Sequence, residues 1–578
     1  MKKSVSILLL AAAMAASVFA GCGNQGGAGA ASTGNSGGAG TAAESTTVGG
    51  TGDKPFMKFN EVVEVHTGQW INPTDTLPEG KSVDNNQYTD YLLENYNIKI
   101  VCDWSAASGS DFDQKVSLCI ASDTLPDGVS VSRQYMLRAA KSDMLYDITD
   151  LFQEYASDQV KEAMNSTGGR AYTDASYQGK QVALPGIDVQ VGGISNMNIR
   201  QDWLDQLGLE VPKTVDELET VAAAFAQAKL GGPDTIPIAG PSKNATGYGN
   251  FLSTGATTGG FDAIFSAHDA YPGYWITGDD GKVIYGTLTD NTKAALLKLA
   301  DWYQKGYIDP EMGTRDSNLE PINAGSVGVY MGAWWVVGYG TGDAYRNNPE
   351  ANWQTYPLYT DDGKWNSHMP SATNGYTIMN KKCGEDQVKA MIIMSNALLR
   401  DEKYFDVSEE PLDFYPIRNL MAAADECEYT YHEMVKVLDG DAQVEDYNVE
   451  DSVYKLLYSD VGMVKDGIPG YSKGAQLSVS DFDMQTNFGN FQRLYSLMVG
   501  CRPFATVTMD KAVYSETYSM TATMETKWAN LKTKEDEMIL KIITGKSDIS
   551  AFDAFVQEWL AEGGADITAE VQELADMQ

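Results

Sequence analysis

Residues 61–132 alternate between strand and helix patterns, and this alternation constrains the fold more than any other feature of the sequence. Three short stretches place apolar residues at every second position, and the two stretches between them place apolar residues at helical spacing. In chain order the stretches are 63–66, 88–96, 98–102, 112–120 and 128–132. This order predicts an α/β fold with a parallel sheet. Ligands of such sheets bind beyond the carboxyl ends of the strands, so we expect Trp70, Trp104 and Arg133 at the edge of a binding site.

The length and composition of the chain exclude several classes of protein. At 578 residues the chain is too long for one core, and we expect two or three lobes. The 43% of apolar residues excludes a wholly disordered chain. The net charge of −37 repels phosphate backbones, so we expect no nucleic-acid partner. Six cysteines without a C-x-x-C pair fit neither a disulfide-dense scaffold nor a zinc module, and we expect most of them to be buried thiols.

The N-terminus has the features of an export signal. Two lysines precede an apolar stretch at 7–16 that is shorter than the ~20 residues of a membrane-spanning helix. Ala20 and Gly21 before Cys22 resemble the bacterial lipobox, although Phe19 stands where leucine is usual. The resemblance implies a signal peptide at 1–21, a lipid on Cys22 and a location on the outer face of the bacterial cell membrane. The alternative is an ordinary secretory cleavage site followed by an incidental cysteine.

The residues after Cys22 predict a tether. Glycine, alanine, serine and threonine dominate this stretch, and such chains behave as flexible linkers. We expect the linker to extend over 22–55. Apart from the leader, no run of 18 apolar residues occurs, so the lipid is the only expected membrane attachment.

Two helices can be predicted from their first residues. Thr214 with Glu217 forms a capping box ahead of an apolar face at 218–225. Ser550 begins a similar helix, and we expect Gly563-Gly564 to end it.

Several segments together resemble one family, the extracellular solute-binding proteins of ABC importers, in particular the long oligosaccharide-binding lipoproteins of the family 1 type. The order and spacing of these segments carry the resemblance, because no single piece is specific. They are Ser122-Asp123-Thr124-Leu125-Pro126-Asp127, residues 198–209, Gly306-Tyr307-Ile308-Asp309-Pro310, residues 325–335 and the amphipathic helix that ends at Gly563-Gly564.

The resemblance implies a two-lobed α/β fold of the periplasmic-binding-protein type (class II), with a hinge and a ligand cleft between the lobes. The chain would cross between lobes near 184–186 and near 373–376. We therefore expect one lobe from 56–187 and 374–430 and the other from 188–373 and 431–578.

A calcium loop of long family members is not matched here. At the corresponding position, residues 227–234 offer one carboxylate, whereas hard cations take six or more oxygens. Residues 439–450 have acids at suitable positions, but Val444 stands where an EF-hand loop needs glycine. We expect no metal ion and no other cofactor.

Tryptophans in glycine-flanked loops are the candidate ligand contacts. Sugar rings present C–H patches that lie flat on indole rings, while their hydroxyls need polar partners. Arg133 and Asp202 are candidates to bind hydroxyls, although Asp202 could equally cap a helix. The candidate aromatic residues are Trp70, Trp104, Trp275, Trp334 and Trp335.

An enzyme is the less favoured interpretation. Residues 470–474 match G-x-S-x-G, but no apolar strand precedes them, and all four histidines lie before Ser472, which excludes the α/β-hydrolase order. We therefore predict a monomeric binding protein, without catalytic residues, that captures an oligosaccharide and delivers it to a transmembrane permease. The alternatives are a surface-anchored glycosidase, or the same fold binding a peptide or a cationic solute.

Overall fold

The fold is described from a computed structural model. It describes residues 49–72, 75–107, 109–243, 245–253, 255–278, 280–407, 409–418, 421–449 and 451–576. The predicted signal peptide, Cys22 and most of the predicted linker lie outside the described residues.

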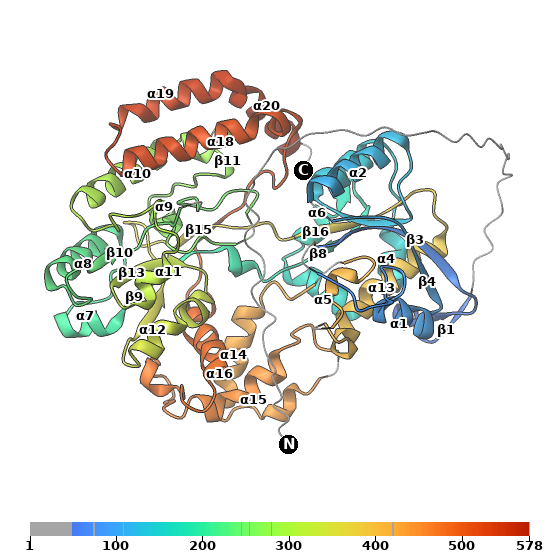
Figure 1. The fold of residues 1–578 in the computed structure, drawn as a ribbon, viewed down its shortest axis with the longest axis horizontal. Coiled ribbons are helices and arrows are strands. Elements are labelled where there is room, and N and C mark those ends of the chain that lie inside the picture. The colour runs from blue at the N-terminus through green and yellow to red at the C-terminus, as the bar shows by residue number, and fades with distance from the viewer. Residues whose placement is uncertain are drawn as a thin grey trace. The chain divides into compact units, whose positions relative to one another are not determined.

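A five-stranded sheet forms the centre of the first lobe (Figure 1). Its order is β4-β3-β5-β16-β8, and β3, β4 and β5 are parallel, as the alternation predicted. β16 runs antiparallel to both of its neighbours, so the sheet is mixed where a parallel sheet was expected. The strands are β3 (Val63–Trp70), β4 (Ile98–Ala106), β5 (Gly128–Val131), β8 (Ala183–Gly186) and β16 (Gly375–Met379).

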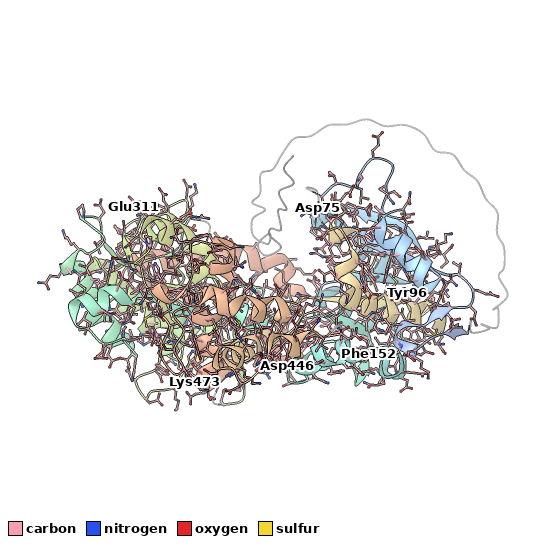
Figure 2. All side chains as sticks on the ribbon, turned by 90° about the horizontal axis from the view of Figure 1, so that it is seen from below. Asp75, Tyr96, Phe152, Glu311, Asp446 and Lys473 are labelled. Atoms are coloured by element: carbon pink, nitrogen blue, oxygen red, sulfur yellow. A yellow bond between two sulfur atoms is a disulfide. The ribbon has the colours of Figure 1, made fainter. Side chains whose placement is uncertain are left out.

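Helices pack on both faces of this sheet and close two apolar clusters. Helix α13 comes from far along the chain yet packs on β3, α4 and α5, and Figure 1 shows it among the blue elements. Tyr96 and Phe152, labelled in Figure 2, are buried in one of these clusters. The helices are α1 (Gln87–Tyr96), α2 (Gly109–Ser122), α3 (Arg133–Lys141), α4 (Thr149–Tyr155), α5 (Asp158–Ser166), α6 (Arg170–Asp174) and α13 (Glu385–Asp401).

The second lobe is built on a four-stranded sheet of order β10-β13-β9-β14. β10 is parallel to β13, and β9 is antiparallel to both of its neighbours. Two further two-stranded sheets, β11 with β12 and β15 with β17, flank it. The strands are β9 (Asn196–Arg200), β10 (Ile236–Ile238), β11 (Trp275–Thr277), β12 (Val283–Tyr285), β13 (Val327–Gly332), β14 (Trp353–Tyr356), β15 (Asn366–His368) and β17 (Lys511–Val513).

The helices of the second lobe enclose two more apolar clusters. The capping box is confirmed: Thr214 accepts a hydrogen bond from the backbone of Glu217 and opens α8. The helices are α7 (Gln201–Leu207), α8 (Val215–Ala228), α9 (Asp262–Ala267), α10 (Asp290–Gln304), α11 (Leu319–Asn323), α12 (Gly342–Asn347), α14 (Glu426–Asp439), α15 (Leu457–Gly467), α16 (Phe488–Tyr495), α17 (Arg502–Thr506), α18 (Ala522–Ile543), α19 (Ser550–Trp559) and α20 (Ala565–Ala575).

The glycine pair near the C-terminus turns the chain without ending the helical region. Gly563 has a φ of +132°, a backbone conformation that residues other than glycine rarely adopt. Helix α20 begins at Ala565 directly afterwards. The expected helix end is therefore a sharp bend between α19 and α20.

Three chain segments join the two sheets. In the first two, β8 pairs with β16, so that Gly186 lies opposite Gly375. In the third, Ile187 bridges to Met421, and the Gln190 amide donates to the Ala424 carbonyl. We call residues 186–190, 369–375 and 421–425 the crossing segments.

The end of the predicted linker belongs to the fold. β1 (Gly50–Thr51) pairs with β2 (Lys58–Phe59), and the carbonyl of Pro55 accepts a hydrogen bond from Asn396. The expected linker boundary at residue 55 was therefore placed too late, because backbone pairing does not need the apolar side chains that the sequence lacks here.

One disulfide joins two helices of the second lobe. Cys427 at the start of α14 bonds to Cys501 just before α17, across a Cα–Cα distance of 5.7 Å. Cys102, Cys119 and Cys383 are free thiols, but of these only Cys119 is buried. The expectation that most cysteines are buried thiols is therefore wrong for the five described ones, because two form the disulfide and two are half-buried.

Candidate functional site

The carboxyl ends of the parallel strands bring three predicted site residues to one edge of the first sheet. Trp70 lies opposite Ala106 at the end of β3, and Gly68 lies opposite Trp104. A Cβ at Gly68 would come within 2.3 Å of the Trp104 ring, so this glycine lets the indole lie against the strand. Arg133 begins α3 directly after β5. Both indoles are half-buried against the core cluster that contains α3.

A series of polar contacts between side chains starts at Arg133. Its Nη2 lies 3.5 Å from Oδ1 of Asp174, and Thr373 donates to Oδ2 of Asp174 at 3.2 Å. Thr373 also shares a short hydrogen bond with the Tyr376 hydroxyl. Burial raises the pKa of Asp174, while Arg133 opposes that shift. The Nε of Arg133 is buried without a hydrogen-bond partner among the described residues.

Residues of both lobes meet beside this group. The guanidinium carbon of Arg170, at the start of α6, lies 3.1 Å from the ring centroid of Tyr514. Gln190, on the first crossing segment, donates to the Tyr514 hydroxyl at 3.2 Å. Tyr518 donates to the carbonyl of Met369 at 2.7 Å. Burial raises the pKa of Tyr518. The charge of Arg170 lowers this pKa and the charge of Asp174 raises it, so both groups lie close enough to act on Tyr518 electrostatically.

A cavity of about 460 Å³ adjoins the crossing segments, and Gln190 forms part of its wall. Trp365 and Phe504 supply aromatic surface, and Asp425 and Glu428 supply carboxylates. Burial raises the pKa of Glu428 to about 7, and its Oε2 has no hydrogen-bond partner among the described residues. The cavity therefore combines aromatic walls with a buried carboxyl oxygen that has no hydrogen-bond partner in the described part of the chain.

We call this region the crossing site. It offers aromatic faces, hydrogen-bond donors and acceptors from both lobes, which is the combination that a polyhydroxylated ligand requires. Its members are Arg133, Arg170, Asp174, Gln190, Thr373, Tyr376, Glu428, Tyr514 and Tyr518.

Trp334 and Trp335 lie at the edge of the second sheet. They follow β13, whose last residue, Gly332, pairs with Asn196 at the start of β9. Trp335 is 38% exposed, and Trp334 packs partly on the core. Both amide atoms of the buried Asn196 lack partners among the described residues. This edge is thus a second place where aromatic and unpartnered polar groups coincide.

Trp275 corrects the sequence interpretation, because the structure places it in the core. Its side chain is 0% exposed and packs against Tyr285, Trp528 and Trp559 at ring-centroid distances of 4.8, 6.4 and 6.1 Å. A ring without exposed surface has no face for a sugar. Its glycine-flanked position arises from close backbone packing, since a Cβ at Gly273 would come within 2.6 Å of the Gly249 carbonyl.

Asp202 is also separated from the other candidates. Its oxygens accept hydrogen bonds from Arg200, from Nε at 2.8 Å and from Nη2, and it also accepts from the Asn352 amide at 3.2 Å. It follows the opposite end of β9 from Asn196. The carboxylate is therefore engaged within the second lobe by Arg200 and the Asn352 amide, and its predicted contact with a ligand stays a prediction.

Several members of the crossing site were missed in the sequence. Arg170 follows Gly168-Gly169, the same glycine flanking that selected the tryptophans. Tyr514 and Tyr518 stand in a polar stretch after β17 and could have been chosen as aromatic candidates. Gln190 and Glu428 gave no local signal, because only the pairing of the crossing segments brings them together.

The segments that resembled other motifs have ordinary local roles. Residues 470–474 form a loop after α15, where Tyr471 donates to Asp439 at 2.7 Å. Lys473, labelled in Figure 2, pairs with Asp439 and Asp441. Within the described ranges, no group of three metal-ligating side chains could hold an ion, and no helix there is long and apolar enough to cross a membrane.

Comparison with protein families decides the relationship that the segments suggested. The sequence profile of the family described as "Bacterial extracellular solute-binding protein" matches residues 87–432, which is more than half of the chain. This chain belongs to that family. The predicted relationship is therefore confirmed, and the family is extracytoplasmic.

Two curated relatives match part of the chain. The fructooligosaccharide ABC transporter substrate-binding protein FusA of Streptococcus pneumoniae is 30% identical over 229 residues, 37% of this chain and 40% of FusA. The polygalacturonan/rhamnogalacturonan-binding protein YtcQ of Bacillus subtilis is 25% identical over 232 residues, 38% of this chain and 41% of YtcQ. The matches thus span about two fifths of these relatives. Both relatives are binding proteins by name.

Solved structures agree with the family in fold. An extracellular solute-binding protein from Bifidobacterium longum subsp. infantis has a TM-score of 0.55 at 16% identity, covering 89% of this chain and 98% of its own. This likeness confirms the expected two-lobed fold of the periplasmic-binding-protein type.

Proposed function

We propose that this protein captures an oligosaccharide between its two lobes and delivers it to the permease of an ABC importer. The observation that carries the proposal is the crossing site, where Arg170 and Gln190 meet Tyr514. Both curated relatives are named for carbohydrate ligands, which supports a sugar in preference to a peptide.

The chemistry of the site suits a sugar. Tyrosine rings bind the C–H faces of pyranose and furanose rings, while Gln190, Thr373 and Glu428 can exchange hydrogen bonds with hydroxyls. At the sheet edges we keep Trp70, Trp104, Arg133, Trp334 and Trp335 as candidate contacts. The two edges belong to different lobes, so a ligand that touches both would favour a closed arrangement by its differential contacts.

We propose lobe boundaries at the crossing segments, with 56–187 and 374–425 in one lobe and 188–373 and 426–578 in the other. The last boundary moves from the expected residue 430 to the start of α14, because Cys427 packs in a cluster of the second lobe. The apolar clusters support this division, because two clusters draw nearly all their members from the first set and two from the second. The two-residue strand β1 would be added to the first lobe.

We also propose that the protein is held to the membrane by a lipid on Cys22 after removal of 1–21, and that it acts as a monomer without catalysis. A stretch of export-signal character followed by Cys22 supports the anchor. A receptor needs no bond-breaking step, since permease and ATPase subunits would perform transport.

The test is a thermal-shift screen of the protein without its leader against neutral and acidic oligosaccharides, followed by calorimetry. A ligand that binds only the native state raises the melting temperature. Tyr514→Ala should abolish most of that rise, whereas Tyr404→Ala, which removes an exposed ring elsewhere in the first lobe, should leave it unchanged. Failure of every saccharide to bind, or recovery of cleaved sugar after incubation, would refute the proposal.

A further inference from the structure

We propose that the captured oligosaccharide is acidic and that Arg133 and Arg170 bind the carboxylate of a uronic acid unit. This inference rests on the proposed function and narrows its ligand class.

Arg170 differs from most arginines of this chain in having no carboxylate partner among the described residues. The sequence has ten arginines and 79 acidic residues, so carboxylates are abundant. Seven arginines lie within 4.0 Å of a carboxylate oxygen, namely Arg133, Arg200, Arg315, Arg346, Arg400, Arg418 and Arg493. Among the described residues, Arg138, Arg170 and Arg502 have no such partner, and Arg502 donates instead to the Thr355 carbonyl. In so acidic a chain, an unpaired guanidinium at a site between lobes is available to an anion from outside.

Arg170 is held in a geometry that leaves its donors free. The flat face of its guanidinium lies on the Tyr514 ring, 3.1 Å from the centroid, while its N–H groups point along the plane. No hydrogen bond from this side chain occurs within the described part of the chain. Stacking fixes the planar fork, which matches a carboxylate in a bidentate contact.

Arg133 supplies a second, incompletely used guanidinium. Its side chain is 13% exposed, its Nε has no partner in the described residues, and its contact with Asp174 is 3.5 Å. That separation is longer than the 2.7–2.9 Å of a strong charged hydrogen bond. A ligand carboxylate would give Arg133 Nε the hydrogen-bond acceptor that it lacks among the described residues.

The crossing site is far less acidic than the whole chain. Its charged members, Arg133, Arg170, Asp174 and Glu428, carry a formal sum of zero when all are ionised and +1 when Glu428 is protonated, within a chain of net charge −37. Exposed charges beyond a Debye length of about 8 Å are screened at physiological salt, so these near groups outweigh the distant carboxylates. The two guanidiniums disfavour a cationic solute, and a neutral sugar has no carboxylate to offer either of them.

The experiment compares matched ligands by calorimetry. An oligogalacturonate and its carboxyl-reduced counterpart share linkages and length, and differ only in the carboxylate. We expect the acidic ligand to bind at least tenfold more tightly, because hydrogen bonds to charged groups are worth more than neutral ones. An oligomannuronate pair extends the comparison to a second uronic acid.

Three variants localise the effect. Arg170→Gln should weaken binding of the acidic ligand about tenfold or more, with little effect on the reduced ligand. Arg170→Lys retains the charge but loses the fork and should give an intermediate loss. Arg138→Gln removes the same charge from an exposed position on α3 and should change neither affinity. A thermal melt without ligand verifies that each variant is folded.

The outcomes separate this inference from the proposed function. Equal affinity for the acidic and reduced ligands, or equal losses on both in Arg170→Gln, would overturn the uronic acid assignment while leaving oligosaccharide capture intact. Binding of neutral saccharides alone would do the same. Failure to bind any saccharide, acidic or neutral, would overturn both the uronic acid assignment and the proposed function.

Discussion

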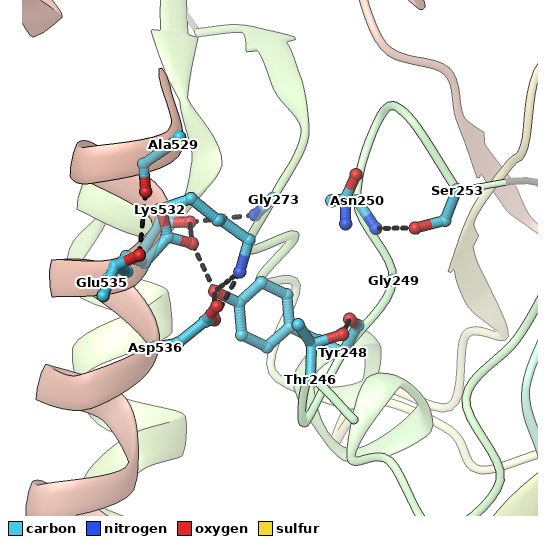
Figure 3. A network of polar contacts seen from close by, with 12 residues as sticks. Thr246, Tyr248, Gly249, Asn250, Ser253, Gly273, Ala529, Lys532, Glu535 and Asp536 are labelled. Carbon is cyan, nitrogen blue, oxygen red and sulfur yellow. Dashed lines mark hydrogen bonds and ion pairs between the residues drawn. The ribbon is translucent and has the colours of Figure 1, made fainter. Parts of the chain in front are cut away.

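Two polar clusters of this protein differ in how completely their groups are partnered. In the second lobe, Glu535 on α18 is 0% exposed, and its oxygens accept hydrogen bonds from the hydroxyls of Tyr248, Tyr285 and Thr287. Lys532 donates to the Tyr248 hydroxyl at 2.9 Å and also pairs with Asp536, as the dashed lines in Figure 3 show. This cluster is self-contained, and it fixes the C-terminal helices to the loops around β11 and β12.

The crossing site leaves comparable groups without partners. Arg133 Nε and Glu428 Oε2 are buried and make no hydrogen bond to a described residue. Unpartnered buried polar groups are costly in a folded protein and are rare for that reason. The Glu535 cluster therefore satisfies its own polar groups, whereas the crossing site keeps buried polar atoms that cost stability, and we propose that a ligand completes their contacts.

The largest effect should come from breaking the satisfied cluster. Glu535→Ala leaves three buried hydroxyls without their acceptor and opens a cavity, so we expect the free energy of unfolding to fall by about 3–5 kcal/mol. Ligand affinity should stay unchanged. Urea unfolding checks the first and calorimetry the second. Glu537→Ala, on the exposed side of the same helix, is the control and should shift stability by less than ~0.5 kcal/mol. Equal effects of the two variants would contradict the comparison.

At Glu428 we expect substitution to raise the free energy of unfolding instead of lowering it. Its pKa is about 7 in the folded protein against a usual value of 4.5, so the folded state holds a proton that the unfolded chain releases. Stability from this group is therefore lost as pH rises from about 4.5 to about 7. Glu428→Gln removes this loss and should stabilise the protein by up to about 3 kcal/mol at pH 8, with little change at pH 4.

The control for this pH dependence is Glu573→Gln, at an exposed position of α20. It should follow the wild-type stability at every pH, measured by urea unfolding across pH 4–8. A Glu428→Gln variant that is less stable than wild type at pH 8 would show that the carboxyl group has a partner in solution.

A smaller loss of stability is expected where the sequence suggested a ligand contact. Asp202→Asn weakens the bidentate contact to the nearly buried Arg200 and should lower the free energy of unfolding by about 1.5–3 kcal/mol. Oligosaccharide affinity should not change. Asp205→Asn on the exposed side of α7 serves as the matched control. If Asp202→Asn lowered oligosaccharide affinity without changing the free energy of unfolding, Asp202 would be a ligand contact.

The smallest effects separate the ring of Tyr514 from its hydroxyl. Tyr514→Ala removes the aromatic face and should reduce ligand affinity about tenfold, or about 1.4 kcal/mol. Tyr514→Phe loses only the acceptor for Gln190 and should change affinity by about 0.5–1 kcal/mol at most. Calorimetry distinguishes them. A larger loss for phenylalanine than for alanine would mean that the hydroxyl, and not the ring, contacts the ligand.

Local patterns were read correctly where a few neighbouring residues decide the structure. The capping box at Thr214, the strand 63–70 and the three parallel strands depend on contacts close in sequence or on the alternation of elements. The edge position of Trp70 and Trp104 followed from the same rule. The alternation could not reveal β16, because that strand comes from residues far beyond the segment.

Candidate contacts failed where composition was the only guide. Glycine flanking selected both Trp335, which is partly exposed, and Trp275, which is enclosed by three aromatic rings. A glycine allows close approach of either a ligand or another part of the backbone, and the sequence does not distinguish them. Likewise, the sequence did not show that Arg200 holds the Asp202 carboxylate.

The sequence alone determined the family, the acidic exported character of the chain and the elements of its first sheet, since these depend on composition, segment order and short-range periodicity. Only the tertiary structure decided which polar groups meet. Arg170 and Tyr514 stand more than 300 residues apart, and folding of the crossing segments brings them into contact. Such contacts depend on the packing of the whole chain, because each residue by itself is compatible with exposure, pairing or ligand binding.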